Sequence, residues 1–205
     1  LRRLAPENPA YESVLKAERA AERAADLTRQ LLAYSGRGTF NVRALDLNVL
    51  ILENLHFLEL AIPKEIVLEQ ELGNDLPLIR ADAGQMQQVV MNLIINASEA
   101  IGRRAGTVSI RTSLAAIDEE RIDEWEVAKE TLSPGSYLRL DVSDNGSGMG
   151  PDVVKKVFDP FFTTKVTGRG LGLSAVVGIV RAHRGALRVE SEEGRGTTFS
   201  MIIPV

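Results

Sequence analysis

The sequence predicts an α+β fold in which helices cover one face of an antiparallel sheet, giving a two-layer α/β sandwich. Apolar residues recur at helical spacing through residues 82–101, the clearest helix of the chain. Apolar and polar residues alternate through residues 107–114 and 137–143, as in strands with one buried face. Two more strand-like segments, joined by a turn at Glu193–Gly194, close the chain. This mixture favours a layer of helices packed on a sheet.

The other elements follow from the same periodicities. We expect helices at residues 48–61, 82–101, 151–157 and 171–183, and strands at 66–72, 107–114, 137–143, 186–190 and 198–203. Asp82, followed three residues later by Gln85, forms a capping box that marks the start of the long helix. Residues 115–136 are rich in charge and end in Pro134–Gly135, so we expect an exposed excursion there.

The N-terminal part of the chain predicts a separate helix over residues 11–35. A near-heptad seam of mostly small residues runs along it: Val14, Ala17, Ala21, Ala24, Thr28 and Leu31. Such a seam suits packing against a partner helix, although a lone exposed helix has the same periodicity. Gly36 and Gly38 end the helix. We therefore divide the chain into a helical segment at 1–36, a linker at 37–48 and a compact domain at 49–205.

Composition excludes several classes of protein. The chain has 205 residues, a net charge of −4, two histidines and no cysteine. A disulfide scaffold and thiolate-bound zinc are excluded, and the charge gives no reason to expect a nucleic-acid surface. No apolar run approaches the ~18 residues of a membrane-spanning helix, and residues 1–10 do not resemble a signal peptide. Because the chain begins at Leu1 rather than Met, we expect it to be part of a longer protein.

A polar stripe runs along the long helix. Gln88, Asn92, Asn96 and Glu99 follow one another at helical spacing, while the other positions are largely apolar. Asparagine is a poor helix former, and a buried amide needs a hydrogen-bonding partner. We therefore favour a ligand-facing stripe over core amides satisfied by the backbone or a solvated edge. An amide oxygen is also a suitable ligand for Mg²⁺.

Three glycine clusters follow in order. Asp144 ends a strand and precedes Gly146 and Gly148, so its carboxylate could accept from an exocyclic amine while the glycines admit a flat ring. Residues 168–173 open a helix with spaced glycines, which leaves backbone N–H groups suited to phosphate. Residues 194–198 form the third cluster, between the last two strands. An ordinary turn is the alternative for each, most strongly for the third.

An aromatic segment lies between the first two clusters. Phe158, Phe161 and Phe162 precede Lys165, which suggests a lid hinged on an apolar anchor. Lys165 and Arg169 could reach phosphates from this lid. Alternatively, the phenylalanines belong to the core and the two cations are solvated.

These segments together resemble the catalytic, ATP-binding domain of sensor histidine kinases, in the gyrase, chaperone, mismatch-repair and histidine-kinase ATPase superfamily. The matching segments are QQVVMNLIINASEAI (the N box), DNGSGM (G1), FDPFFTTK (F), GRGLGL (G2) and GRGTTF (the last glycine box). LTRQLLAYSGRG resembles the end of the second helix of the dimerisation and phosphoacceptor hairpin. The motifs are most similar to those of nitrogen-regulation-type and hybrid kinases. The resemblance implies a Bergerat-type ATP-binding fold.

The resemblance also implies roles for individual residues. Asn96 would coordinate Mg²⁺ on the ATP phosphates, with Asn92 and Lys165 beside them. Asp144 would bind the adenine amine. The remaining residues implied to contact the nucleotide are Gly146, Gly148, Arg169, Gly170, Leu171, Gly172, Thr197 and Thr198, with Gly168 flanking the lid.

One departure concerns the nucleophile, which in this family is a histidine on the first hairpin helix. The two histidines here, His56 and His183, stand in other contexts, and we expect both to be structural. The resemblance then implies phosphotransfer to a histidine outside this chain, on a hairpin helix of the same parent or its dimer mate. A response-regulator receiver domain would then receive the phosphate. The parent protein would be a cytoplasmic homodimer, and this segment would make no direct contact with a membrane.

Two alternatives remain. A hydrolytic ATPase of the superfamily carries a glutamate base one turn before the metal-binding asparagine, where this chain has Asn92, which cannot take a proton. An idle, nucleotide-gated interaction module is the second alternative. The intact motifs argue against it.

Overall fold

The computed structural model describes residues 11, 14–15, 41–165 and 170–205. Its elements are β1 (Arg43–Leu45), α2 (Leu47–Ala61), β2 (Ile66–Leu72), β3 (Ile79–Ala81), α3 (Ala83–Ile101), β4 (Gly106–Ile117), α4 (Glu119–Ile122), the 3-10 helix η1 (Lys129–Thr131), β5 (Gly135–Asp144), α5 (Pro151–Val154), α6 (Gly172–Ala182), β6 (Ala186–Glu192) and β7 (Gly196–Pro204). The helix expected at 11–35, and the hairpin segment at 1–36 that contains it, lie almost wholly outside the described residues. Within the described residues, no helix is long and apolar enough to cross a membrane.

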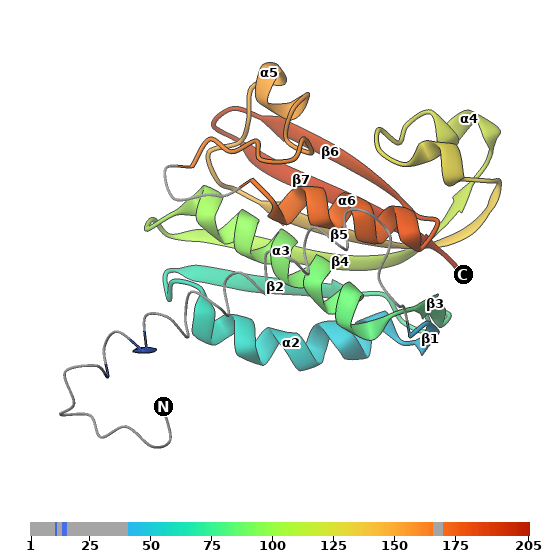
Figure 1. Cartoon of the computed structure of the whole chain (residues 1–205), viewed down its shortest axis with the longest axis horizontal. Helices are drawn as coiled ribbons and strands as arrows, with labels where there is room; N and C mark the ends of the chain where they lie inside the picture. Colours follow the sequence, from blue (N-terminus) through green and yellow to red (C-terminus); the bar gives the residue numbers. More distant parts are fainter. Residues whose placement is uncertain (1–10, 12–13, 16–40, 166–169) are drawn as a thin grey trace.

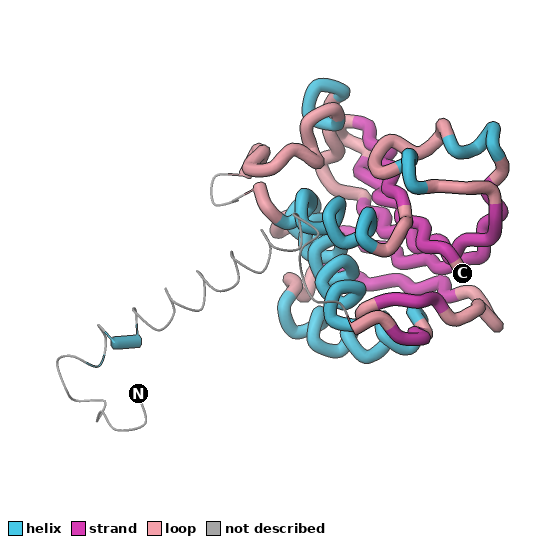
Figure 2. The backbone as a smooth tube through the Cα atoms, turned by 45° about the vertical axis from the view of Figure 1, so that its right-hand side comes forward, coloured by secondary structure: helices cyan, strands magenta, loops and turns pink. Residues whose placement is uncertain are grey.

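The fold has two layers, as the sequence predicts. Five strands form one sheet in the order β2-β4-β5-β7-β6, and helices α2, α3 and α6 lie together on one face of it (Figures 1 and 2). The expectation of a wholly antiparallel sheet is wrong for one pair, because β2 and β4 run parallel. The reason is the crossover through α3 between these strands, which returns the chain in the same direction.

A second, two-stranded sheet joins β1 to β3. The sequence predicts a linker at residues 37–48, but residues 43–48 are part of the folded domain. Leu47 is 1% exposed in the main core. The side chain of Asp46 caps α2 by accepting from the backbone N–H of Val49 at 3.1 Å. Three-residue strands carry too little periodicity to be recognised in a sequence.

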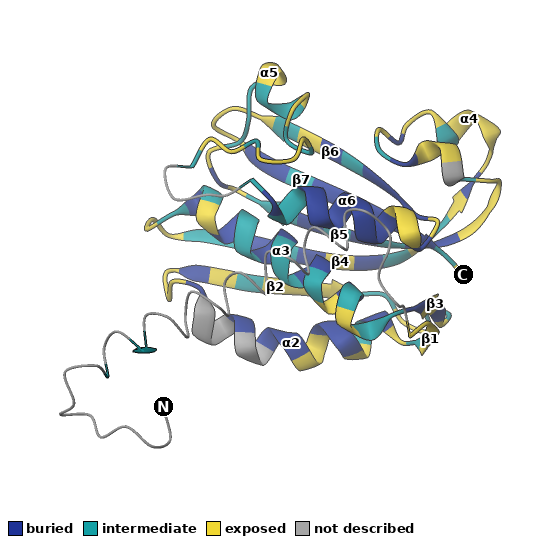
Figure 3. Cartoon of the chain, in the orientation of Figure 1, coloured by how far each residue is buried: buried dark blue, intermediate teal, exposed yellow. Residues whose placement is uncertain are grey.

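Helix α3 lies at the centre of the helical layer. It contributes eight buried residues: Met86, Val89, Val90, Leu93, Ile94, Ala97, Ser98 and Ile101. It packs against α2 and α6 on either side and against β4, β5 and β7 beneath, so its inner face is fully covered (Figure 3). The helical periodicity predicted this buried face.

The start of α3 differs from the expected capping box. The Asp82 carboxylate accepts from the backbone N–H of Gln85 at 3.1 Å, which is one half of the box. In the other half the backbone N–H of Asp82 donates to Nε2 of His183 at 3.1 Å, in place of the Gln85 side chain. Nδ1 of His183 lies 2.8 Å from the carbonyl oxygen of Ile179 and therefore carries the proton that this oxygen accepts. His183 is thus structural, as expected: it joins the end of α6 to the start of α3.

Residues 115–136 are better packed than the exposed excursion that the sequence predicts. Trp125 is 4% exposed and belongs to a small second core with Ile117, Tyr137, Ala186 and Ile202. An isolated bridge between Val127 and Leu187 fastens the segment to β6. Charged residues cover its outer side, which is why its composition indicated exposure. His56, the other histidine, lies in α2.

Replacing His183 tests this connection between α6 and α3. We expect His183→Asn to lower the free energy of unfolding by about 1–3 kcal/mol, because it leaves the partly buried N–H of Asp82 without an acceptor. His183→Gln places an amide oxygen near the former Nε2 position and should recover much of the loss. Urea unfolding measures both variants. Equal destabilisation by the two would contradict this role of Nε2.

Candidate functional site

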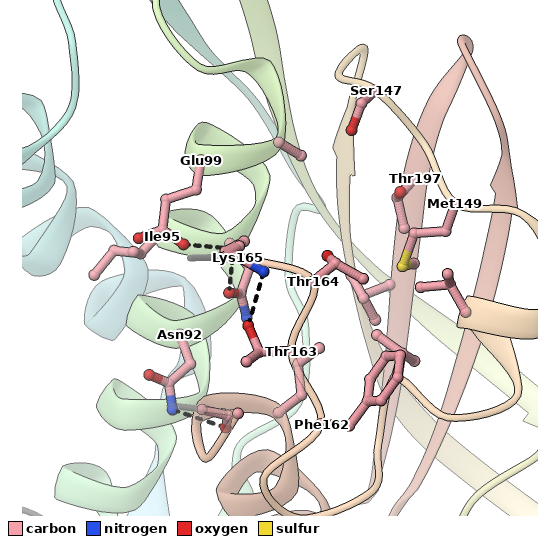
Figure 4. A pocket seen from close by; sticks show the side chains of 18 of the residues that line it. Asn92, Ile95, Glu99, Ser147, Met149, Phe162, Thr163, Thr164, Lys165 and Thr197 are labelled. Atoms are coloured by element: carbon pink, nitrogen blue, oxygen red, sulfur yellow. Dashed lines mark hydrogen bonds and ion pairs between the residues drawn. The ribbon is translucent and has the colours of Figure 1, made fainter. Parts of the chain in front are cut away.

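A cavity of about 510 Å³ opens beside the outer face of α3 (Figure 4). Its walls come from α3, the end of β5 and the loop after it, α5 and the nearby Val157, residues 162–165, residues 170–173 at the start of α6, and the first part of β7. These include the N, G1, F, G2 and last glycine segments singled out in the sequence. The fold therefore brings all five motifs to one place.

Three of the four residues in the polar stripe line this cavity. They are Asn92, Asn96 and Glu99, whereas Gln88 lies outside it. The amide nitrogen of Asn92 donates to the carbonyl oxygen of Gly172 at 3.2 Å, which ties α3 to the first residue of α6. The stripe thus faces a cavity, as the ligand-facing interpretation predicts. The Asn92 amide also has a backbone partner, as the alternative of amides satisfied by the backbone predicts.

The cationic side chain of Lys165 lies at one end of the cavity. The ammonium of Lys165 donates to Oδ1 of Asn96 at 3.2 Å and forms an ion pair with Glu99 (Figure 4). The backbone N–H of Lys165 donates to the hydroxyl of Thr163 at 3.1 Å, so the turn that precedes the lysine is also ordered. Because the Lys165 and Glu99 side chains are 38% and 52% exposed, solvent screens their attraction. Lys165 can therefore leave Glu99 for another anionic partner at a small cost in free energy.

A half-buried carboxylate belongs to another part of the wall. Asp144 ends β5, and its Oδ1 accepts from the backbone N–H of Gly146 at 2.7 Å. Burial raises the pKa of Asp144 and outweighs the backbone N–H groups of Gly146 and Thr197 and the charges of Lys165 and Arg104, which all lower it. The ionised group therefore costs folding stability at neutral pH. Such a cost is common at functional sites.

The glycines of the first cluster have different roles. Gly148 lines the cavity at φ +62°, and a Cβ there would lie 1.9 Å from the carbonyl oxygen of Glu192. Only glycine allows the loop after β5 to pass so close to the end of β6. Gly146 is not part of the cavity wall, and it contributes through its hydrogen bond to Asp144.

The second cluster is joined to the aromatic segment. Gly170, Leu171 and Gly172 all line the cavity, whereas Gly168 and Arg169 fall outside the described residues. Gly170 has φ +65°, and its carbonyl oxygen accepts from the backbone N–H of Phe161 at 2.8 Å. Leu171 precedes α6, and no side chain caps this helix start.

The three phenylalanines expected to anchor a lid do not act alike. Phe158 packs edge-on against Phe199 with ring centroids 6.1 Å apart, at the margin of the main core. Phe162 lines the cavity. Phe161 is 66% exposed and has φ +67°. An apolar anchor is therefore present, but only part of the segment supplies it.

The structure separates the two threonines of the last cluster. Thr197 lines the cavity and is the β-ladder partner of Asp144. The side chain of Thr198 lies on the opposite face of the sheet, where its hydroxyl is 2.8 Å from that of Ser143. Thr198 is therefore not brought to the cavity, contrary to the residue set that the resemblance implied. Side chains alternate along a strand, so only one of two successive threonines can face the cavity.

Sequence reasoning missed residues that reach the site only through tertiary packing. Met149 and Thr163 are in the wall, and Ser191 lies directly behind it on β6. Met149 lies in the G1 segment and Thr163 in the F segment, so their sequence positions could have indicated that they line the site. Ser191 had none, because its relation to Thr197 depends on strand register.

Comparison with known proteins agrees with this geometry. The sequence profile described as "Histidine kinase-, DNA gyrase B-, and HSP90-like ATPase" matches residues 81–205. The chain belongs to this family. The matched range contains every part of the cavity wall.

Its relatives within the family are sensor histidine kinases. The chain is 37% identical to the sensor kinase CckA of Brucella abortus (strain 2308) over 96% of this chain and 20% of CckA. It is 36% identical to the sensor histidine kinase ZraS of Escherichia coli (strain K12) over 80% of this chain and 31% of ZraS. The chain thus spans a fifth to a third of the length of these two relatives.

A solved structure has the same fold over nearly the whole chain. The histidine kinase ThkA, in complex with the response regulator protein TrrA, is 26% identical with a TM-score of 0.66. The match covers 99% of this chain and 53% of that one.

The pKa of Asp144 predicts the pH dependence of nucleotide binding. The ionised carboxylate of Asp144 accepts more strongly from a base amine than the protonated acid does, and its raised pKa means that protonation begins at higher pH than for an ordinary aspartate. We expect the affinity for ATP to fall on acidification below neutral pH. Inorganic tripolyphosphate lacks the base, so its affinity should not depend on the protonation of Asp144. Calorimetric titrations over about pH 4–7 compare the two ligands. Parallel pH profiles would contradict this assignment of Asp144.

Proposed function

We propose that this chain contains the ATP-binding catalytic region of a sensor histidine kinase. It would transfer the γ-phosphate of ATP to a histidine on a hairpin helix, and from there to an aspartate of a response regulator. One observation carries the proposal: a single cavity has a half-buried carboxylate, Asp144, in one part of its wall and a cationic side chain, Lys165, held by amide and carboxylate oxygens in another. This pattern suits a ligand with an amine-bearing base and a chain of phosphates.

The base end would be recognised by Asp144. A carboxylate accepts from an exocyclic amine, and two backbone N–H groups hold it in place without using all of its lone pairs. Apolar side chains complete this part of the wall and would contact the faces of a ring: Met149, Val153, Val157, Leu173 and Phe199. An adenine nucleotide fits both features.

The phosphate end would be served by Asn92, Asn96 and Lys165. Their amides and ammonium are compatible with phosphate oxygens, and the uncapped start of α6 adjoins them through Gly172. Catalysis would then depend on positioning and on neutralisation of charge, as in other phosphoryl transfers. Gly170 and Leu171 would position the same phosphates through the backbone.

Asn96 is a suitable protein ligand for Mg²⁺. Its Oδ1 already accepts from a cationic group, and no cluster of three or more His, Cys, Asp or Glu side chains that could hold a metal exists within residues 41–165 and 170–205. Mg²⁺ typically uses few protein ligands and retains several waters, so a single amide together with nucleotide phosphates is sufficient. When bound, the metal would neutralise charge on the phosphate oxygens.

Phosphotransfer is favoured over hydrolysis because the polar stripe of α3 offers no general base that could activate water. The amide of Asn92 cannot take a proton and is bonded to Gly172. The remaining carboxylate in the stripe, Glu99, forms an ion pair with Lys165. Neither is arranged as a general base for water.

The phosphoacceptor would come from outside the described residues. Both ring nitrogens of His183 are hydrogen-bonded to backbone groups, which makes it unsuitable as a nucleophile. We propose a histidine on a hairpin helix of the same parent or its dimer mate, with residues 1–36 contributing the second hairpin helix.

A receiver domain is proposed as the next partner. The similar kinase ThkA was solved in complex with a response regulator protein, which supports this choice. A cytoplasmic, homodimeric parent fits this chemistry. No nucleic acid or direct membrane contact is proposed for this segment.

The destination of the γ-phosphate tests the proposal. The preceding hairpin helix is restored from the parent gene, the protein is incubated with γ-labelled Mg-ATP, and protein-bound label is compared with free phosphate. We expect acid-labile, base-stable label on the protein and none in an Asp144→Asn variant. Rapid release of phosphate without labelled protein would favour the hydrolase instead. Bound ATP with neither product would favour the nucleotide-gated module.

A lysine substitution tests the phosphate end separately. Lys165→Met keeps the length of the side chain but removes its charge, so it should weaken ATP binding about tenfold or more, as expected for a charge-assisted hydrogen bond. AMP, which lacks the outer phosphates, should be much less affected. Lys155→Met is the matched control, because Lys155 lies outside the cavity wall on the exposed end of α5. Equal losses for ATP and AMP would contradict the role of Lys165.

A further inference from the structure

Ser191 occupies a position behind the cavity wall for which the proposed function gives no role. It lies on β6 and is paired in register with Thr197 of β7. Its hydroxyl has three neighbours: the backbone N–H of Met149 at 2.8 Å, the carbonyl oxygen of Gly196 at 3.0 Å and the hydroxyl of Thr197 at 2.9 Å. Met149 and Thr197 lie close together in the cavity wall (Figure 4).

The directions of these three hydrogen bonds follow from simple counting. A serine hydroxyl has one hydrogen and two acceptor positions. The carbonyl oxygen of Gly196 can only accept, so it receives the hydrogen of Ser191. The N–H of Met149 can only donate, so it uses one acceptor position. The remaining acceptor position faces Thr197, which must therefore donate its own hydroxyl hydrogen to Ser191.

This arrangement fixes the character of the Thr197 hydroxyl. With its hydrogen directed at Ser191, the oxygen offers only lone pairs to other partners. The backbone N–H of Thr197 donates to Asp144, and the ionised carboxylate of Asp144 also only accepts. The two neighbouring side-chain groups at this end of the cavity therefore both require hydrogen-bond donors from a ligand or from bridging water.

We infer that Ser191 is a specificity-positioning residue: by holding Thr197 as an acceptor, it makes the base end of the cavity favour 6-amino over 6-oxo purine nucleotides. The inference rests on the proposed function, because it assigns the base to this end. A 6-amino group donates to these acceptors, whereas a 6-oxo group presents another acceptor at the same position. Without Ser191, the hydroxyl of Thr197 can rotate and donate to the 6-oxo oxygen.

A double-mutant cycle with ATP and inosine triphosphate tests this inference. The two nucleotides differ at position 6 of the base and at N1, which carries a proton only in inosine. The measured quantity is the ratio of their dissociation constants by calorimetry. Ser191→Ala should reduce the preference for ATP about tenfold, the discrimination expected from one hydrogen bond. Thr197→Val removes the hydroxyl through which Ser191 acts. In that background Ser191→Ala should leave the ratio unchanged.

The outcomes separate this inference from the proposed function. If the wild-type chain binds ATP with a preference that Ser191→Ala does not alter, the inference fails and the proposed function stands. The same reduction in both backgrounds would also overturn it, because a general loosening of the β6–β7 turn would then be the cause. A wild-type chain that binds neither nucleotide overturns both. If Ser191→Ala does not fold, Ser191→Cys, which keeps a similar volume with a weak donor and acceptor, replaces it in the cycle.

Discussion

The packing of α3 against the sheet is the constraint on which the rest of the structure depends. One side of this helix is buried in the main core, and the opposite side carries Asn92, Asn96 and Glu99 in the cavity wall. Because helical geometry fixes the angle between the two sides, the core determines where the polar groups stand. The start of the helix is secured as well, since hydrogen bonds of Asp82 and His183 join it to the end of α6.

The two ends of the cavity are held in different ways. Around Asp144, backbone groups from β5, β6 and β7 approach so closely that glycine is required at Gly148, and the hydrogen bonds are short and sheltered. Around Lys165, an exposed ion pair to Glu99 supplies the order, and such pairs contribute little net stability. The Asp144 end is thus preorganised, while the Lys165 end can rearrange its charges when a charged ligand enters.

Hydrogen positions matter as much as heavy-atom positions at the preorganised end. The carboxylate of Asp144 is kept in a place where burial opposes its charge, and Ser191 limits the orientation of Thr197. Both features reduce the reorganisation that a ligand must cause on binding, which is the general benefit of preorganisation. Their cost appears in folding stability, where a neutral, apolar wall would be more favourable.

The sequence by itself determined the fold class, the long elements and most of the cavity wall, because helical and strand periodicities and the five ordered motifs are local features. It did not determine the strands β1 and β3, the parallel β2–β4 pair or the packing around Trp125. Those depend on contacts between distant segments. The same holds within the site: strand alternation excluded Thr198, and register placed Ser191 behind Thr197. Only the tertiary structure decides such pairings, since no local pattern records which residue will lie opposite another.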